Sequence, residues 1–195
     1  MAIEVDPVET TRRRLSRAKK SELKSYLLAA LHDATYSKLH QTYRYSQLSL
    51  KWLELLQMMF EQLGFKSWIY REGKTRSVWV LETSTKLNEL ASPKNISEKI
   101  AYIRGYFDAE GGMPKSNSSF LYFQFSQKDK SDLFEVKHWL EEVGIKCGAI
   151  HNPSKKVDSE YWRFFVSRIS HKDFMQIISS WHPRKKKQME LRMKI

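Results

Sequence analysis

Two carboxylates, Asp108 and Glu110, stand at the end of a helix-like run rich in small residues, IAYIRGYFDAEGGMP (100–114), just before Gly111-Gly112. A helix C-terminus carries the negative end of the macrodipole, so an acid there costs a few tenths to about 1 kcal/mol unless a positive partner is close. That partner is either a basic side chain or a metal ion. These acids are therefore the first candidates for a chemical site.

A second segment repeats this pattern earlier in the chain. LLAALHDATY (27–36) overlays YIRGYFDAEG (102–111), which pairs Asp33 with Asp108 and Thr35 with Glu110. Small residues recur four positions apart in both segments, at Ala30 and Ala34 and at Gly105 and Ala109. Such spacing gives each helix one face of small residues. We expect the two helices to pack on each other along a pseudo-twofold axis, with Thr35 and Glu110 side by side and the glycine pair ending the second helix.

The elements that must position these helices also occur twice. YRYSQLSLKWLELLQMMFEQLGFK (43–66) aligns without a gap to FQFSQKDKSDLFEVKHWLEEVGIK (123–146). The alignment matches Ser46-Gln47 with Ser126-Gln127, Tyr45 with Phe125 and Gly64 with Gly144. A repeat of this length predicts two pseudo-symmetric halves.

Each copy is typical of a strand, a helix and a hairpin, preceded by one of the two helices described above. The strands alternate and are rich in aromatic residues, and the helices end at Gly64 and Gly144, which suit a left-handed cap. The first hairpin turns at Glu72-Gly73, the second at a longer, Pro-containing segment around 152–158. We expect an α+β fold in which a basic arm (1–20) precedes a first half (21–90) and a second half (91–195) with a basic C-terminal helix from about Lys172. The stretch SWHPRKKKQ (180–188) is either a phosphate clamp or an exposed basic tail.

The composition indicates a globular protein with a polyanionic partner. The 195 residues are 41% hydrophobic, and 34 Lys and Arg against 22 Asp and Glu give a formal net charge of +12. Such an excess favours nucleic acid. The single cysteine, Cys147, excludes an intramolecular disulfide and a cysteine-based zinc site. No apolar run is long enough to span a membrane, so we expect a soluble, cytoplasmic protein.

The paired motifs resemble those of the LAGLIDADG homing endonucleases, in their single-chain form with two motifs. IRGYFDAEG (103–111) matches the nine-residue motif, and LAALHDATY (28–36) is a degenerate first copy. The similarity covers roughly residues 22–183 and includes the order of elements. It implies that the two antiparallel sheets form a saddle lying in the DNA major groove, and that acids at the helix ends bind divalent metal over the scissile phosphates. Mg²⁺ or Mn²⁺ would support cleavage, and Ca²⁺ would bind without it.

The same resemblance implies roles for individual residues. Glu110 takes the metal-binding acidic position, Gln127 and Gln47 orient water, and Lys128 holds water or stabilises phosphate charge. The first half departs from the pattern, with Thr35 at the acid's position and Leu48 at the lysine's. Asp33 is a further catalytic and metal-ligand candidate, although it lies about 200° round a helix from Thr35. The backbone carbonyls of Ala34 and Ala109 are further candidate metal ligands.

A two-stranded ribbon fits the major groove, and alternation directs every second side chain toward the DNA. The outward-facing candidates are Arg44, Arg71, Lys74, Arg76, Gln124, Lys155, Lys156 and Arg163. The alternative is a solvated sheet face.

These features together predict a monomeric, metal-dependent, site-specific endonuclease acting on a long pseudo-palindromic DNA duplex. Thr35 and Leu48 put cleavage of both strands in doubt and favour one strand being cut faster. Two alternatives remain: a degenerate relative that binds DNA without cutting it, and an RNA-splicing maturase. An intron, an intein and a free-standing gene are all contexts consistent with this function.

Overall fold

The computed structural model describes residues 7–73, 76–116 and 118–193. Its first half begins with helices α1 (Pro7–Leu15) and α2 (Lys20–Ala30), and α2 continues as a 3-10 turn, Leu31–Asp33. Strands β1 (Ala34–Ser37) and β2 (Thr42–Gln47), helix α3 (Leu50–Gln62) and strands β3 (Ser67–Arg71) and β4 (Trp79–Thr83) follow. The four strands form one antiparallel sheet in the order β1-β2-β4-β3.

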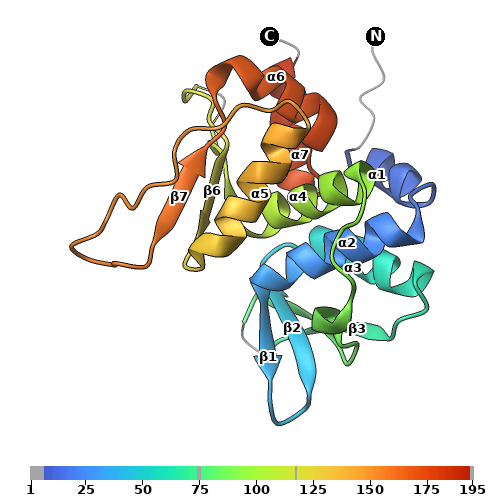
Figure 1. Cartoon of the computed structure of the whole chain (residues 1–195). Coiled ribbons are helices and arrows are strands. Elements are labelled where there is room, and N and C mark those ends of the chain that lie inside the picture. Colours follow the sequence, from blue (N-terminus) through green and yellow to red (C-terminus); the bar gives the residue numbers. More distant parts are fainter. Residues whose placement is uncertain (1–6, 74–75, 117, 194–195) are drawn as a thin grey trace.

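The second half has the same order of elements. It contains α4 (Ile96–Glu110), β5 (Gly111–Gly112), β6 (Gln124–Gln127), α5 (Lys130–Glu142) and β7 (Trp162–Phe165), with the antiparallel sheet order β5-β6-β7. In place of a regular strand equivalent to β3, the second half has two isolated β-bridges, Cys147 with Val166 and His151 with Arg163. The chain ends in α6 (His171–Asp173), a π-helical turn (Phe174–Ile178) and α7 (Pro183–Met193). Figure 1 shows the two sheets on separate sides of the central helices.

The predicted repeat and α+β class are confirmed. Helices α3 and α5 occupy equivalent positions, and each is followed by a glycine in the left-handed region, Gly64 at φ 76° and Gly144 at φ 83°. The sequence did not predict β1 and β5. The first half therefore has one strand more than expected, whereas the second half gains β5 but has only isolated bridges in place of the first strand of its expected hairpin. Strands β1 and β5 directly follow the paired helices, which makes them important for the position of the acids.

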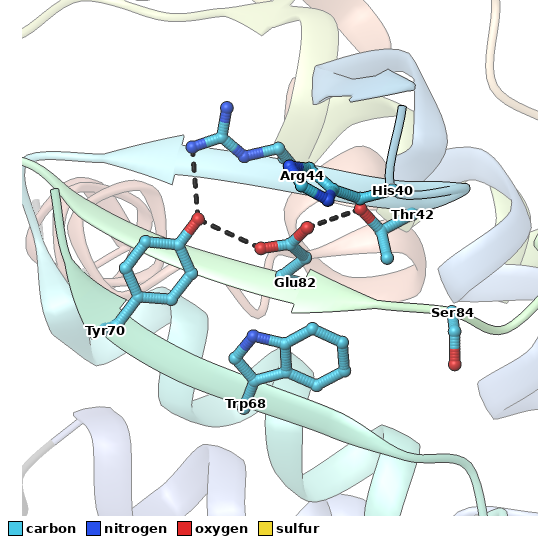
Figure 2. A pocket seen from close by; sticks show the side chains of 7 residues that line it. All are labelled: His40, Thr42, Arg44, Trp68, Tyr70, Glu82 and Ser84. Atoms are coloured by element: carbon cyan, nitrogen blue, oxygen red, sulfur yellow. Dashed lines mark hydrogen bonds between the residues drawn. The ribbon is translucent and has the colours of Figure 1, made fainter. Parts of the chain in front are cut away.

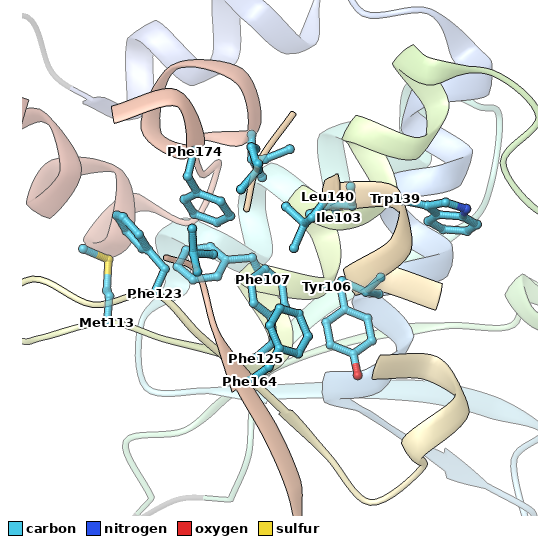
Figure 3. Close-up of a cluster of buried hydrophobic side chains, with 14 of the residues drawn as sticks. Ile103, Tyr106, Phe107, Met113, Phe123, Phe125, Trp139, Leu140, Phe164 and Phe174 are labelled. Carbon is cyan, nitrogen blue, oxygen red and sulfur yellow. The ribbon is translucent and has the colours of Figure 1, made fainter. Parts of the chain in front are cut away.

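Each half has its own apolar core. The second is dominated by aromatic rings, among them Phe107, Phe123, Phe125, Phe164 and Phe174 (Figure 3), with Phe125 and Phe164 stacked at 5.0 Å between centroids. The first core centres on α3, with Trp52, Leu56 and Phe60, and packs on Tyr45 and Leu81 of the sheet. Alternation along the strands therefore buries one face of each sheet and leaves the other facing away from the helices.

Helices α2 and α4 join the halves, and they contact each other more extensively than any other pair of elements in the described chain. Gly105 makes this approach possible. A Cβ at this position would lie 2.4 Å from the carbonyl oxygen of Tyr26 and 3.1 Å from Cβ of Ala29. The predicted packing through small residues is confirmed at Gly105, although its neighbours are Tyr26 and Ala29 instead of Ala30.

The two ends of the chain differ from the expectation. Residues 7–15, predicted as part of a basic arm, form α1, whose Val8 and Leu15 are buried in the first core. The predicted last helix begins near Lys172 but is interrupted after Ile178 and resumes only at Pro183. Within the described residues, no helix combines the length and apolar character needed to cross a membrane.

Candidate active site and nucleic-acid interface

The strand register defines which acids are equivalent in the two halves. Ala34 in β1 pairs with Tyr45, and Gly111 in β5 pairs with Phe125. Because Tyr45 and Phe125 match in the repeat, Ala34 corresponds to Gly111, and the preceding residue, Asp33, corresponds to Glu110. The predicted equivalence of Thr35 with Glu110 is therefore wrong.

The reason is that the first helix ends earlier than the sequence indicated. It tightens into a 3-10 turn that closes at Asp33, and the chain is extended from Ala34 onward. Thr35 is an exposed residue of β1 opposite Arg44. The first half thus retains an acid at its helix end.

Asp33 and Glu110 are partly buried and repel each other. Burial raises the pKa of Asp33 to about 6, although Nε2 of Gln47 donates a 2.6 Å hydrogen bond to its carboxylate. Burial also raises the pKa of Glu110, and the negative charge of Asp33 adds to this rise. A nearby cation stabilises the charged forms of two carboxylates that burial and mutual repulsion disfavour.

The equivalent glutamine of the second half has a different partner. Nε2 of Gln127 lies 3.3 Å from Nδ1 of His32, and His32 in turn lies 3.9 Å from the carboxylate of Asp132 through Nε2. Burial lowers the pKa of His32. Gln127 therefore connects the second half to the residue before Asp33, which is a contact between the halves that the sequence did not reveal.

Lys128 and Leu48 occupy equivalent positions in the two halves, and one is basic where the other is apolar, as the sequence indicated. They follow Gln127 and Gln47, and both are exposed, Leu48 at 77%. The second half thus has a cation beside its glutamine where the first half has an apolar side chain.

Asp108 is a structural residue of the interior. Its carboxylate is buried and accepts hydrogen bonds from the hydroxyl of Tyr26 at 2.7 Å and from backbone N–H groups of Trp181 and His182 at 2.8 and 3.0 Å. It follows that Asp108 is not available to a metal.

The positive partner of this acidic helix end is Lys185. It lies in the stretch 180–188, for which a phosphate clamp and an exposed basic tail were the two expectations. Lys185 itself fills neither role, because it is 3% exposed, whereas Arg184 and Lys187 are exposed. Its ammonium donates to backbone carbonyls at the end of α4. The excess of basic residues at 184–187 was the only sequence signal for it.

The donor atoms present fit a hard divalent cation. Among the described residues no group of three or more His, Cys, Asp and Glu is placed to hold a metal. Two carboxylates with backbone carbonyls and water or phosphate oxygens form an oxygen-rich set that suits Mg²⁺ or Mn²⁺. Ala109 precedes Glu110 in the last turn of α4. Ala34 lies in β1 at the position of Gly111, so His32 is the counterpart of Ala109.

The outer face of the first sheet has the polar character expected of a nucleic-acid surface. A pocket of about 490 Å³ lies there, lined by His40, Thr42, Arg44, Trp68, Tyr70, Glu82 and Ser84 (Figure 2). The buried carboxylate of Glu82 accepts hydrogen bonds from the hydroxyls of Thr42 and Tyr70. Tyr70 accepts one from Arg44 at 3.1 Å, and Arg44 also pairs with Glu72 at 3.2 Å.

Three of the predicted DNA-contacting residues lie on the outer faces of the sheets. Arg44 shares its face with Glu82, and Gln124 and Arg163 share the corresponding face of the second sheet, where both alternate with buried phenylalanines. Arg71 pairs with Trp79, which places it on the other face together with Tyr45 and Leu81. The remaining candidates lie in the hairpin turns, where Arg76, Lys155 and Lys156 are exposed and Lys74 falls outside the described residues.

The fold and the site define a class of protein in which two pseudo-symmetric α+β halves are joined through paired helices whose acidic ends lie next to two sheets. Residues 97–179 match the family model described as a LAGLIDADG-like domain. The homing endonuclease I-ApeI of Aeropyrum pernix is 29% identical over 115 residues, 56% of this chain and 50% of that protein. This chain thus spans about half the length of the curated relative.

Solved structures share the fold. I-DmoI in complex with DNA and Mn is 22% identical with a TM-score of 0.62, covering 83% of this chain and 98% of that one. Its complex with DNA and Ca gives a TM-score of 0.65 at 22% identity and covers 90% and 100%. The N-terminal LAGLIDADG domain of WhiA is 14% identical, with a TM-score of 0.63 over 83% and 82%. The second half of the chain is thus similar in sequence to the LAGLIDADG-like domain, and the described chain shares the fold of these solved structures.

Proposed function

We propose that the protein is a site-specific DNA endonuclease that depends on a divalent metal. The observation that carries the proposal is the convergence of Asp33 and Glu110, one from each half, at the ends of packed helices adjoining two polar sheet faces. I-ApeI is named a homing endonuclease, and I-DmoI has been solved with DNA and Mn or Ca, which supports the same function here.

Each side chain of the site has a role in this reaction. Asp33 and Glu110 hold Mg²⁺ or Mn²⁺, together with the carbonyl oxygens of Ala109 and His32. When bound, the metal polarises the phosphate and lowers the pKa of its water. Gln47 and Gln127 orient water, while Lys128 stabilises the charge that develops on the phosphate.

The outer faces of the sheets bind a duplex long enough to contact both halves. Since both halves lie in one chain, we infer that a single copy binds the target. The reaction takes place inside the cell, where DNA is the substrate.

The test is a Mg²⁺-dependent cleavage selection from a randomised duplex library, followed by a nicking assay with one fluorophore on each strand. Glu110→Gln and Asp33→Asn keep the shape of each side chain but remove its charge, so both should abolish scission while DNA binding persists. The wild type should cut both strands, faster on the strand served by Lys128. Full cleavage by Glu110→Gln contradicts the site assignment.

DNA binding without cleavage is the second candidate function, and the exposed Leu48 favours it. A wild type that retains one duplex through the selection, in Mg²⁺ and in Mn²⁺, without cutting either strand would support this alternative over the endonuclease.

A further inference from the structure

A buried lysine, Lys185, lies at the C-terminal end of α4. The ammonium of Lys185 donates to the backbone carbonyls of Phe107, Asp108 and Gly111, the latter two at 3.0 and 2.7 Å. An ammonium has three N–H groups, and each has a partner here. The last carbonyls of a helix have no partner within the helix, so Lys185 completes the end of α4.

The C-terminal segment that carries Lys185 is held by α4 itself. The guanidinium of Arg104 donates to the carbonyls of Ile178 and, at 3.2 Å, Ile177, and it lies 4.7 Å from the ring centroid of Trp181. One turn later, the carboxylate of Asp108 binds the hydroxyl of Ser180 and the next two backbone N–H groups. Both residues belong to the nine-residue motif, so the motif itself fixes the approach of α7.

The connection between the π-helical turn and α7 is strained. Ser179 has φ 59° and ψ −158°, a region that is essentially restricted to glycine and that costs about 1–3 kcal/mol. Its hydroxyl accepts a 3.1 Å hydrogen bond from the ammonium of Lys186, which is also buried. A segment that keeps such a conformation is fixed by its surroundings. The position of Lys185 at the end of α4 is therefore fixed by the fold of this segment.

Besides forming hydrogen bonds, Lys185 places a positive charge close to the carboxylates of the site. Burying an ammonium is costly unless opposite charge is close. The buried carboxylate of Asp108 is the largest counter-charge of Lys185. The positive charge of Lys185 also acts on both acids of the site, since it lowers the pKa of Asp33 and of Glu110 against the effect of burial. A fixed cation thus sits at the end of α4, which bears Glu110, and its charge also reaches Asp33 at the end of the 3-10 turn that follows α2.

We propose that Lys185 is a positioning residue of the metal centre, a built-in cation that holds Asp33 and Glu110 together while no metal is bound. The inference rests on the proposed function for the identity of the site, but its central claim concerns the metal-free protein. Lys185 does not touch DNA, because all three of its N–H groups are engaged within the protein.

A double-mutant cycle in EDTA at pH 7.0 tests this coupling. Glu110→Gln relieves repulsion, and this relief should be greater when Lys185 no longer offsets it. We expect Glu110→Gln to raise the Tm by about 2–4 °C more in the Lys185→Met background than in the wild type. Ca²⁺ should likewise raise the Tm more in Lys185→Met than in the wild type, and Glu110→Gln should remove that gain.

Lys186→Met is the matched control, because it removes an equally buried ammonium from the same helix that bonds Ser179 instead of α4. It should lower the Tm without coupling to Glu110→Gln. If Lys185→Met does not fold, Lys185→Gln enters the same cycle, since it keeps two donors without the charge. Additive effects at Lys185, or equal coupling at Lys186, overturn the inference. Coupling in a protein that cuts no DNA would refute only the proposed function, whereas cleavage without coupling would refute only this inference.

Discussion

At the scale of single residues, the acid pair is arranged to bind a cation at a cost in stability. The sequence predicted Glu110, Gln127 and Lys128 as one group, but it assigned the first-half position to Thr35. Local pattern could not show that the helix ends at Asp33, because β1 forms only through its pairing with a later strand, opposite Tyr45. The role of Lys185 depends on contacts over 74 residues or more and left no periodic signal.

Asp33→Asn should stabilise the metal-free protein near neutral pH. The pKa of Asp33 is about 6 in the folded chain against an ordinary value of 3.8. The folded state binds more protons between these values, so the stability contribution of Asp33 falls as pH rises through this window and stays low above it. Asn removes the charge and can still accept the hydrogen bond from Gln47.

The measurement is thermal unfolding in EDTA at pH 7.5 and at pH 4. We expect the Tm of Asp33→Asn to exceed that of the wild type by a few degrees at pH 7.5 and to be nearly equal at pH 4. Asp173→Asn, on an exposed carboxylate in α6, serves as the control and should show no such pH dependence. The same Tm difference at both pH values would contradict the prediction.

At the scale of elements, the fold was predictable where the pattern is local. The helical spacing and the two glycine caps predicted α3 and α5 closely, while β5 consists of two glycines and shows no alternation. The interruption after Ile178 was not predictable, because it is stabilised by Arg104 from a distant helix. Alternation also failed for Arg71, whose face follows from the register of β3 with β4.

Gly105→Ala should disrupt the junction of the halves. A Cβ at this position would lie 2.4 Å from a backbone oxygen of α2, and backbone cannot yield as a flexible side chain can. Overpacking of this kind costs about 1–3 kcal/mol, occasionally more. Because the same contact aligns the helix ends, metal-dependent cleavage should fall together with stability.

Urea unfolding of Gly105→Ala and Gly64→Ala separates crowding from backbone strain. A Cβ at Gly64 would meet no atom of the described residues within 4 Å, but φ there is +76°, so the cost comes from the left-handed conformation alone, about 1 kcal/mol. Gly64→Ala should therefore lose less stability and retain strand cutting. A loss of cleavage in Gly64→Ala as large as that in Gly105→Ala would argue against the helix junction as the cause.

At the scale of the whole molecule, two similar halves carry an unequal set of charges. The net charge of +12 favours a polyanion, and the outer sheet faces are where the duplex is proposed to lie. Arg44 is already paired with Glu72 and Tyr70, whereas no ion pair to Arg163 is found in the part of the chain that the structure describes. Arg163 instead lies 5.3 Å from the ring centroid of Phe165 and donates a 3.3 Å hydrogen bond through Nε to Nε2 of His151, which is no carboxylate. The second half should consequently hold the phosphate backbone more strongly at this position.

Binding should therefore weaken steeply with salt, and the two arginines should contribute unequally. Each neutralised phosphate adds about −0.9 to the slope of log K against log salt. Arg163→Gln should reduce the magnitude of that slope by about 1. Arg44→Gln should reduce it by less, because Arg44 must give up Glu72 before it can reach a phosphate. Fluorescence anisotropy with the selected duplex in Ca²⁺ measures both slopes, and Lys172→Gln in α6 is the control for loss of charge elsewhere. A flat salt dependence in the wild type, or equal slopes for Arg163→Gln and Lys172→Gln, would show that the outer face of the second sheet does not hold the DNA.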